Sequence, residues 1–509
     1  MLIYSKLCSC SLLGLQGAIV DVEVDVRSYG LPNFDIVGLP DAAVREARDR
    51  VDLAIKNSGL RFPEHHVVVN LAPADLRKEG AGFDLAIALG ILSASQQIVM
   101  SDPEETLIFG ELSLDGSLRR VPGALSMAMS AAAAGMKRIF LPEGNQQEAL
   151  LVKDLEVYAF HNLKEIIEHL RYEMIKEPSV PDMRSSERSY SADFADIKGQ
   201  VGAKRACEIA AAGGHNLLMI GGPGSGKTLL ARAFPSILPD LDFTEALQIT
   251  QIHSVAGLLT RQDDLMRERP FRAPHHSISN AGLIGGGSYP KPGEVSLAHN
   301  GVLFLDELPE YKRFMLELLR QPLEDRQVTI ARVQATYTFP ASFMLIAAMN
   351  PCPCGFYGDL AEQCVCGDMQ VRRYLNRISG PLLDRIDLQI EVPRLSFDEL
   401  HQTTSNESSK EVRTRVQKAR SRQRARLEPL GLFHNAEMNG KLVRQFCHLT
   451  EESQRLLRQS FEKLHLTARS HDRILKVALS IADLAGSSQI EVHHLAEAVS
   501  YRSLERMQK

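Results

Sequence analysis

A glycine-rich stretch in the middle of the chain has the spacing of a phosphate-binding loop. Residues 221–228 read GGPGSGKT, which fits the pattern G-x-x-x-x-G-K-[ST]. A strand pattern at 217–220 precedes it and a helical run follows, so glycines there let backbone N–H groups wrap phosphates at a helix start. Lys227 is predicted to reach the β- and γ-phosphates of ATP and Thr228 to bind Mg²⁺. The residues expected to contact the nucleotide are Gly221, Gly222, Pro223, Gly224, Ser225, Gly226, Lys227 and Thr228.

Two carboxylates and an amide are candidates to complete a hydrolytic site. Asp306 and Glu307 follow an apolar run, and Asn350 follows another. Asp306 is predicted to hold Mg²⁺ with Thr228, directly or through water, and Glu307 to polarise the attacking water. Asn350 is predicted to orient that water near the γ-phosphate. The alternatives are solvated acids at the end of an edge strand and, for Asn350, a turn residue.

Two arginines are candidates for contacts with the terminal phosphate. Arg385 lies in the string SGPLLDRID. An arginine supplied by a neighbouring subunit would stabilise the charge of the transition state. The alternative for Arg385 is an ion pair within the chain, with Asp384 or Asp387. Arg473, in a helical pattern of the last domain, is predicted to contact the γ-phosphate from a lid, and Arg469 is the competing candidate.

Half of the eight cysteines form one cluster, Cys352, Cys354, Cys364 and Cys366. Four thiolates near one another suit tetrahedral Zn²⁺, and a cytosolic chain disfavours disulfides. The C-x-C…C-x-C spacing differs from the commoner C-x₂-C, and the alternative is four independent small or buried cysteines. The hypothesis is that zinc pins the loop after Asn350.

Length and composition limit the class of protein. The 509 residues, of which 44% are hydrophobic, predict about three domains and exclude global disorder. No run reaches about 18 apolar residues, so we expect no membrane-spanning helix, no membrane partner and a cytoplasmic location. The net charge of −5 conceals an uneven distribution, because residues 401–509 hold 19 Lys and Arg against 12 Asp and Glu.

The elements that must position these residues alternate between strand and helix, which is typical of an α/β protein. The first part of the chain has strand patterns at 18–26 and 67–71 and helical patterns at 41–57, 84–93 and 124–134. A second α/β unit begins at residue 193, with strands at 217–220, 302–305 and 343–348. From about residue 396 the chain has only helical patterns.

Six strings spread over nearly the whole chain resemble the AAA+ ATPases, their magnesium-chelatase-like branch and, within it, the bacterial YifB/ComM family. They are NFDIVGLPDAAVREARDRV, GGPGSGKT, RPFRAPHHSIS, GEVSLAHNGVLFLDELPE, AAMNPCPCG and SGPLLDRIDL. The resemblance implies an ATP- and Mg²⁺-dependent homo-hexamer that acts as a DNA helicase, driving branch migration in natural transformation and homologous recombination. Single-stranded or branched DNA is the partner implied.

The resemblance also divides the chain. It implies a Lon-protease-like (ribosomal S5 domain 2-like) α/β domain at 1–170, a linker at 171–192, an AAA+ core at 193–395 and a helical lid at 396–509. Lon-type peptidases use a Ser–Lys dyad, but Gly82 stands at the serine position here and Leu125 at the lysine position. Without a hydroxyl nucleophile or its base, acyl transfer has no agent, so we expect a noncatalytic domain.

Three segments are candidates to face DNA. The insertion 269–287 contains Arg272, His275 and His276 among glycines, and the alternating stretch 327–339 predicts a hairpin with Arg332 near its tip. Structural histidines and a solvated arginine are the alternatives. The third segment, 410–426, has eight Lys and Arg against one Glu, with a solvated helix face as its alternative.

A DNA-translocating ATPase is therefore the preferred interpretation. A magnesium-chelatase-type motor subunit and a protein-remodelling chaperone share the ATPase core and are the alternatives. A noncatalytic scaffold is disfavoured by the intact loop lysine and the paired carboxylates.

Overall fold

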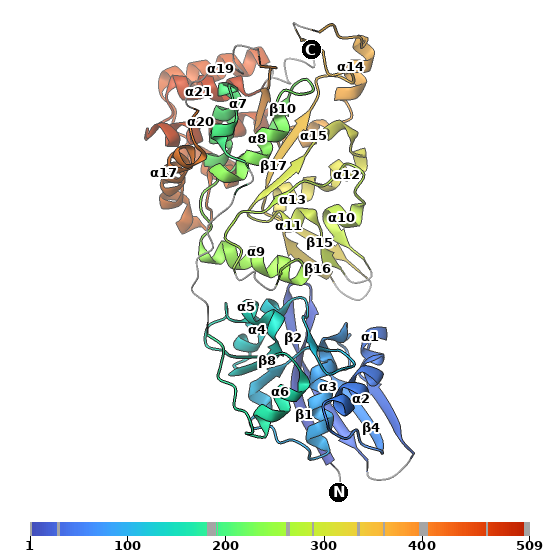
Figure 1. Ribbon diagram of the computed structural model, residues 1–509. Helices are drawn as coiled ribbons and strands as arrows, with labels where there is room; N and C mark the ends of the chain where they lie inside the picture. The colour runs from blue at the N-terminus through green and yellow to red at the C-terminus, as the bar shows by residue number, and fades with distance from the viewer. Residues whose placement is uncertain are drawn as a thin grey trace. The chain divides into compact units, whose positions relative to one another are not determined.

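The computed structural model describes residues 3–27, 31–180, 190, 192–260, 265–287, 290–332, 336–359, 362–395, 406–464 and 467–502. The chain forms two compact units (Figure 1). Unit 1 contains residues 1–186 and 246–266, and unit 2 contains the remainder. No helix of the described residues is long and apolar enough to cross a membrane.

Unit 1 is built on a seven-stranded mixed sheet with the order β3-β4-β2-β1-β5-β8-β9. Its strands are β1 (Ile3–Leu13), β2 (Gln16–Val26), β3 (Asn33–Val37), β4 (His66–Ala72), β5 (Thr106–Ile108), β8 (Arg138–Pro142) and β9 (Glu156–Phe160), with the small pair β6 (Glu111–Leu112) and β7 (Leu118–Arg119) beside it. The predicted strands at 18–26 and 67–71 are confirmed. Alternate valines of β2, such as Val20 and Val22, point into the core.

The helices of unit 1 cover this sheet. They are α1 (Ala42–Arg45), α2 (Ala47–Asn57), α3 (Asp84–Ala94), α4 (Ala124–Ala133), α5 (Gln146–Ala149) and α6 (Leu163–Leu170). The pattern at 41–57 predicted one helix, but the structure ends α1 before Glu46 and begins α2 after it. Helix α3 is apolar on all sides and almost wholly buried against β1 and β2, as expected of a central core helix.

Unit 1 also includes most of a helix that lies between ATPase motifs in the sequence. Helix α9 (Phe243–Ala256) supplies residues 246–256 to this unit. The Gln251 side-chain amide donates to the carbonyl oxygen of Leu15 at 2.8 Å. No sequence pattern predicted that residues 246–266 belong to unit 1.

Unit 2 is built on a five-stranded parallel sheet with the order β11-β14-β17-β10-β18. The strands are β10 (Leu217–Ile220), β11 (Phe271–Arg272), β14 (Val302–Leu305), β17 (Met344–Met349) and β18 (Leu388–Glu391). Strands β10, β14 and β17 are fully buried, which explains their continuous apolar runs. Because all five strands are parallel, the residues that follow β10, β14 and β17 meet at one edge of the sheet.

Helices and two hairpins surround this sheet. The helices of the core are α7 (Val201–Gly213), α8 (Lys227–Ala233), α10 (Asn280–Ile284), α11 (Glu294–Leu297), α12 (Arg313–Leu318), α13 (Arg320–Asp325), α14 (Asp368–Leu375) and α15 (Gly380–Leu383). The predicted hairpin at 327–339 is confirmed as β15 (Gln327–Ala331) and β16 (Thr336–Pro340). A shorter hairpin pairs β12 (Gly285–Gly286) with β13 (Lys291–Pro292).

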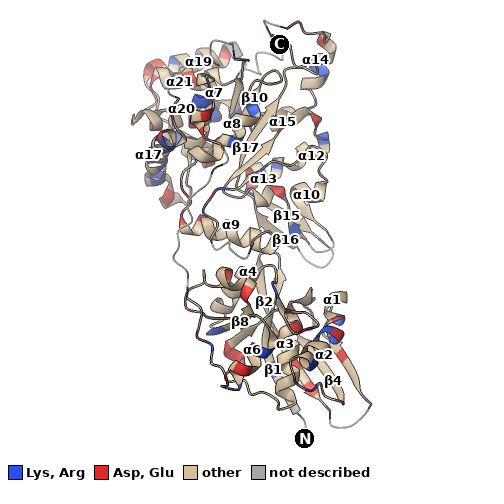
Figure 2. Ribbon diagram, viewed as in Figure 1, with Lys and Arg blue, Asp and Glu red and all other residues tan. Residues whose placement is uncertain are grey.

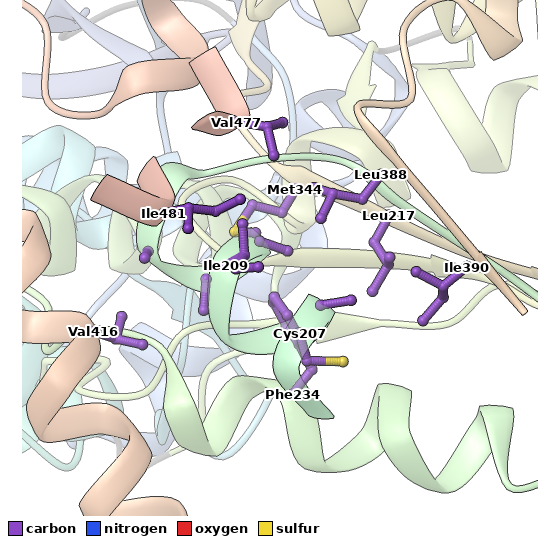
Figure 3. Packing of buried hydrophobic residues seen from close by; sticks show 14 of the residues in the cluster. Cys207, Ile209, Leu217, Phe234, Met344, Leu388, Ile390, Val416, Val477 and Ile481 are labelled. Atoms are coloured by element: carbon purple, nitrogen blue, oxygen red, sulfur yellow. The ribbon is translucent and has the colours of Figure 1, made fainter. Parts of the chain in front are cut away.

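The C-terminal residues are helical, as predicted, and they share one hydrophobic core with the parallel sheet. The helices are α17 (Ser409–Leu427), α18 (Gly440–Phe446), α19 (Glu451–Leu464), α20 (Ala468–Ala485) and α21 (Val492–Ser500). Figure 3 shows Val416 of α17 and Ile481 of α20 near Ile209 of α7, and Leu217 of β10 belongs to the same cluster. The helical segment is therefore anchored to the nucleotide-binding half by burial.

Candidate active site

The glycine-rich loop lies between β10 and α8. Gly224 and Gly226 have φ of +74° and +91°, a conformation that other residues rarely adopt. The Lys227 ammonium is folded into the loop, donating to the carbonyl oxygens of Gly221 at 2.7 Å and Gly222 at 2.8 Å. Burial lowers the pKa of Lys227, and the nearby Asp306 carboxylate opposes that shift. The loop thus holds a cation where phosphate oxygens would need one.

The two carboxylates after β14 lie beside this loop. The Thr228 hydroxyl donates to Asp306 Oδ2 at 2.9 Å, so one hydroxyl and one carboxylate oxygen converge. Both are the hard oxygen donors that Mg²⁺ prefers, and this pair fits the ion predicted there. Glu307 has φ +51°, its backbone N–H donates to Asp306 Oδ1 at 2.9 Å, and its side chain is 58% exposed. Glu307 is therefore accessible to water and substrate.

Asn350 follows β17 at the same edge of the sheet. Ile220 of β10 is in register with Met349, and the Gly221 N–H donates to the Met349 carbonyl oxygen at 3.2 Å. The half-buried Asn350 is thus next to the start of the phosphate loop. The parallel sheet therefore places Asn350 at the same edge as the phosphate loop, and its role towards the attacking water stays a prediction.

Arg385 is buried within its own chain. Its side chain is 6% exposed and forms an ion pair with Glu324, and Nη1 donates to the Pro381 carbonyl oxygen at 2.5 Å. The intrachain alternatives considered from the sequence were Asp384 and Asp387, so the observed partner differs from both. Burial lowers the pKa of Arg385, while the carboxylate of Glu324 opposes that shift.

Arg473 lies on α20 and is linked to the core through Asp387. Its Nε is 4.0 Å from Asp387 Oδ1, and His215 Nδ1 is 3.5 Å from the other oxygen. Burial alone would raise the pKa of Asp387, but the hydrogen bond from His215 and the charge of Arg473 hold it well below its ordinary value. The lid arginine therefore faces a carboxylate that stays ionised.

Of the residues expected to face DNA, two are bonded to other side chains of the chain. Arg272 forms a bidentate pair with Glu294, at 2.6 and 2.7 Å. His275 Nδ1 lies 2.7 Å from the Ser277 hydroxyl. The charge of Arg272 is therefore compensated inside the chain, and a DNA phosphate would compete with Glu294 for it.

His276 and Arg332 are placed differently. His276 Nδ1 lies 3.6 Å from Glu307 Oε2, beside the predicted base. Arg332 is exposed at the end of β15, and a Cβ built on Gly286 would lie 3.4 Å from its Nη2. The insertion thus lies beside Glu307, the predicted base, at one point and borders the β15–β16 hairpin at another.

The basic segment at 410–426 forms helix α17, and most of its arginines are bonded within the chain, so fewer of its charges are free than the sequence suggested. In α17 the arginines reach inward: Arg415 pairs with Glu208, Arg424 with Asp242 and Arg426 with Asp483, and Arg420 donates to the Ala211 carbonyl oxygen. Lys410 and Lys418 are exposed. Figure 2 shows the basic residues along α17 beside acidic residues of neighbouring elements.

The four clustered cysteines converge. The Sγ atom of Cys352 is 3.3 Å from that of Cys354 and 3.7 Å from that of Cys364, and all four Sγ atoms lie within 4.8 Å of one another. A tetrahedron with Zn–S bonds of about 2.3 Å has edges of about 3.8 Å. The donor set and its spacing therefore fit Zn²⁺, and the cysteines form no disulfide.

The loop carried by these cysteines lies against the phosphate loop. A Cβ built on Gly355 would lie 2.6 Å from Pro223 Cδ, and one on Gly222 would lie 3.2 Å from the Gly355 carbonyl oxygen. Arg394, which lies outside this loop in the sequence, forms an ion pair with Glu362 of the loop at 2.7 Å. The metal-type cluster and the nucleotide loop are thus in direct contact.

Gln200 is a further residue of the site, and no motif in the sequence marked it. Its buried side-chain amide donates to the carbonyl oxygens of Ser225 at 3.1 Å and Pro393 at 2.7 Å. These bonds join the phosphate loop to the segment after β18.

The Lon-type dyad positions in unit 1 carry no reactive groups. Gly82 has no side chain, and a Cβ built there would lie 3.3 Å from Val121 Cγ1. Leu125 is fully buried on α4. A hydroxyl nucleophile and its base are absent from both of these positions.

Three family models match successive parts of the chain. Residues 193–400 match the family model of the magnesium chelatase subunit ChlI, residues 22–145 match a second ChlI model, and residues 406–502 match its C-terminal model. The uncharacterized protein YifB of Salmonella typhimurium is 45% identical over 497 residues, which cover 97% of this chain and 96% of YifB. Competence protein ComM of Haemophilus influenzae is 43% identical over 519 residues, covering 99% and 98%. Lon protease 2 of Bacillus subtilis is 22% identical over 171 residues, 30% of each chain.

The parallel sheet with its phosphate loop, paired carboxylates and helical C-terminal segment defines an AAA+ ATPase of the magnesium-chelatase type. Because it is 45% identical to YifB and 43% identical to ComM over nearly the full length of each protein, the chain belongs to the YifB/ComM family of these ATPases.

Proposed function

We propose that this ATPase is a hexameric DNA helicase that couples ATP hydrolysis to translocation and drives branch migration during natural transformation and homologous recombination. The observation that carries the proposal is the path of the insertion. It contains His276, 3.6 Å from the predicted base Glu307, and it borders the exposed Arg332. A segment that lies beside both can transmit the state of the nucleotide to the hairpin that carries Arg332.

The hydrolytic step is assigned to the residues at the edge of the parallel sheet. Lys227 and the loop N–H groups bind the β- and γ-phosphates, and Glu307 accepts a proton from the attacking water. Thr228 and Asp306 would hold Mg²⁺, which supplies charge neutralisation on the phosphate oxygens when bound. Asn350 orients the water.

A ring of subunits, proposed to be a hexamer, is needed because Arg385 is proposed to act on the nucleotide of a neighbouring subunit. Arg385 would stabilise the γ-phosphate bound by a neighbour, and this requires it to exchange its partner Glu324 for phosphate oxygens. Arg473 would report the nucleotide state to the lid of its own subunit. The relative named competence protein ComM supports a role in competence.

A zinc ion is proposed for the four cysteines. The Sγ spacing fits a tetrahedral site, and the loop it would hold lies against Gly222 and Pro223. When bound, the ion supplies a fixed cross-link within residues 352–366. Residues 352–366 would support the phosphate loop, because Gly355 packs against Gly222 and Pro223.

The test is an ATPase and strand-displacement assay with single-stranded, duplex and branched DNA, run beside a DNA-free control. A helicase is stimulated by DNA and separates or migrates strands in an ATP-dependent way. Stimulation by an unfolded protein would instead favour the protein-remodelling chaperone, and porphyrin metallation with partner subunits the chelatase motor. Absence of DNA binding by the wild-type hexamer would reject the proposal.

A further inference from the structure

An open, cationic pocket lies between α12 and α14, away from the segments that the sequence marked for DNA. It encloses about 590 Å³ and is lined by Arg313, Met369, Arg372, Arg373, Asn376 and Arg377. All six lining residues are exposed. Figure 2 shows basic residues on α12 and α14 at this site. Four of the six lining residues carry a guanidinium group, so the pocket has the chemistry of an anion site.

The charges of this pocket are largely uncompensated. Arg377 is paired with Glu310, at 2.9 Å, and its guanidinium lies 5.9 Å from the centre of the Tyr374 ring. For Arg372 and Arg373 no carboxylate of the described part of the chain lies within ion-pairing distance. This contrasts with α17, where the arginines are bound to acids and carbonyl groups. The pocket therefore keeps at least two guanidinium groups available for an external anion.

The arrangement suits an extended phosphate chain. Arg372 and Arg373 lie on α14 and Arg377 follows directly after it, while Arg313 lines the same pocket from α12. Planar guanidinium groups bind phosphate oxygens in bidentate fashion, and several on one surface can contact successive phosphates. The lining contains no aromatic ring, so base stacking is not its mode. Met369, which is 76% exposed, adds apolar surface next to the guanidinium groups.

Helix α14 is also connected to the hydrolytic site. Tyr374 of α14 lies near the backbone of Asn350, which lowers the pKa of the Tyr374 phenol, whereas burial raises it and is the larger effect, so that the pKa is about 12. Arg377 donates to the Pro309 carbonyl oxygen at 3.3 Å, two residues after Glu307. An anion that binds Arg377 would therefore act on the segment after Glu307 and, through Tyr374, on Asn350, which follows β17.

We infer that this α12–α14 pocket binds the phosphodiester backbone of a nucleic-acid strand, without reading its sequence. The inference rests on the proposed DNA-translocating function and adds a contact surface to it. Each phosphate that an arginine neutralises releases counterions. The pocket's contacts therefore add to the slope of log K against log salt.

The test replaces the two unpaired arginines and measures salt dependence. The double variant Arg372→Gln/Arg373→Gln removes two positive charges at similar size, and Arg372→Lys/Arg373→Lys retains them. The matched control is Arg455→Gln/Arg458→Gln on α19, where both arginines are exposed. The probe is a fluorescent oligothymidylate, whose binding to the ATP-loaded hexamer is followed over a salt series.

The expected result is a smaller salt slope for the glutamine variant. Loss of two phosphate contacts should reduce the slope of log K against log salt by about 1.5 and weaken binding about tenfold at about 0.15 M salt. The lysine variant should keep most of the slope, and the α19 control should match the wild type. An unchanged slope in the glutamine variant would overturn the inference and leave the proposed function standing, whereas failure of the wild type to bind would reject the function itself.

Two further measurements separate other occupants of the pocket. Inorganic tripolyphosphate is added as a competitor. Stronger competition by it than by unlabelled oligothymidylate, lost in the glutamine variant, would show a site for small phosphates and overturn the inference. Native mass measurement gives the assembly state. If the glutamine variant forms no hexamer and its subunits keep the wild-type salt slope, the pocket is a subunit interface and the inference is wrong.

Discussion

The imidazole of His276 lies 3.6 Å from the carboxylate of Glu307, the residue proposed to activate water. His276 belongs to the insertion that leaves β11, and Glu307 follows the neighbouring strand β14. The rings of His275 and Tyr311 flank His276, with centroids 4.0 and 6.3 Å away. The contact joins the segment proposed to sense DNA directly to the hydrolytic carboxylate.

We predict that His276→Ala weakens the coupling between DNA and hydrolysis. A carboxylate held by an imidazole is less free to accept a proton, so the DNA-free ATPase should rise about threefold to tenfold, a small part of the 10²–10⁴ that a general base contributes. The ratio of the ATPase rate with DNA to the rate without DNA should fall towards one. Steady-state phosphate release with and without DNA measures both values.

His493→Ala is the control for this change, since His493 is an exposed histidine of the lid. If His276→Ala shows the same basal rate and the same stimulation as the wild type, the contact has no role in coupling.

Lys227→Ala and Glu307→Gln should separate binding from chemistry. Lys227 lies inside the phosphate loop, so its loss should abolish both ATP binding and turnover. Glu307 is 58% exposed and makes no contact with the loop carbonyl groups, so Glu307→Gln should bind ATP normally and lose about 10²–10⁴ in turnover. Fluorescent-nucleotide titration and phosphate release check the two values. Normal turnover in Glu307→Gln would remove it from the mechanism.

Arg385 should act on the nucleotide of a neighbouring subunit. Arg385→Ala is expected to lose about 10³ or more in turnover while retaining nucleotide binding. Glu324→Gln frees the guanidinium from its present partner and should preserve turnover.

A mixing experiment distinguishes this role from a structural one. Hexamers of Arg385→Ala and Glu307→Gln subunits contain some interfaces with an intact arginine and an intact glutamate, so mixing should restore part of the activity. No recovery in hexamers of confirmed mixed composition would assign Arg385 to the stability of its own subunit.

Removal of the metal should weaken ATP binding. The purified protein should contain about one zinc per chain, and chelation or Cys364→Ser should release the loop that lies against Gly222 and Pro223. We expect the Kd for MgATP to rise about tenfold to 100-fold, the range typical of lost support around a site. Metal analysis and nucleotide titration measure these effects, with Cys8→Ala in unit 1 as the control. A metal-free protein with unchanged affinity would contradict both parts.

Glu79 should make unit 1 less stable at high pH. Burial raises the pKa of Glu79 to about 7, against the opposing charge of Arg77. A carboxyl group with a raised folded-state pKa stabilises the fold below its unfolded pKa of about 4.3, and this contribution is lost as the pH rises through about 7. Glu79→Gln should therefore gain about 1 kcal/mol at pH 8, after allowing for solvent screening, and little at pH 5.

Thermal melts followed by circular dichroism at both pH values test this, with the exposed Glu104→Gln as the control. Equal melting temperatures of Glu79→Gln and wild type at pH 8 would show that the side chain is solvated when ionised.

The local motifs were predictable from the sequence because their physics is local. Consecutive glycines, a lysine and a threonine specify the phosphate loop, and apolar runs of four to six residues predicted β10, β14 and β17 with nearly the observed bounds. The four cysteines were close in the chain, and the structure brings their sulfur atoms together.

The partners of charged residues were decided only by the tertiary structure. Arg385 pairs with Glu324, 61 residues away, and Arg415 with Glu208, 207 residues away. No local pattern encodes such pairs, because they depend on which helices pack together. For the same reason the sequence of the basic segment, a candidate to face DNA, did not show that most of its arginines are bonded within the chain. The open arginines lie instead on α12 and α14, which only the fold brings side by side around one pocket.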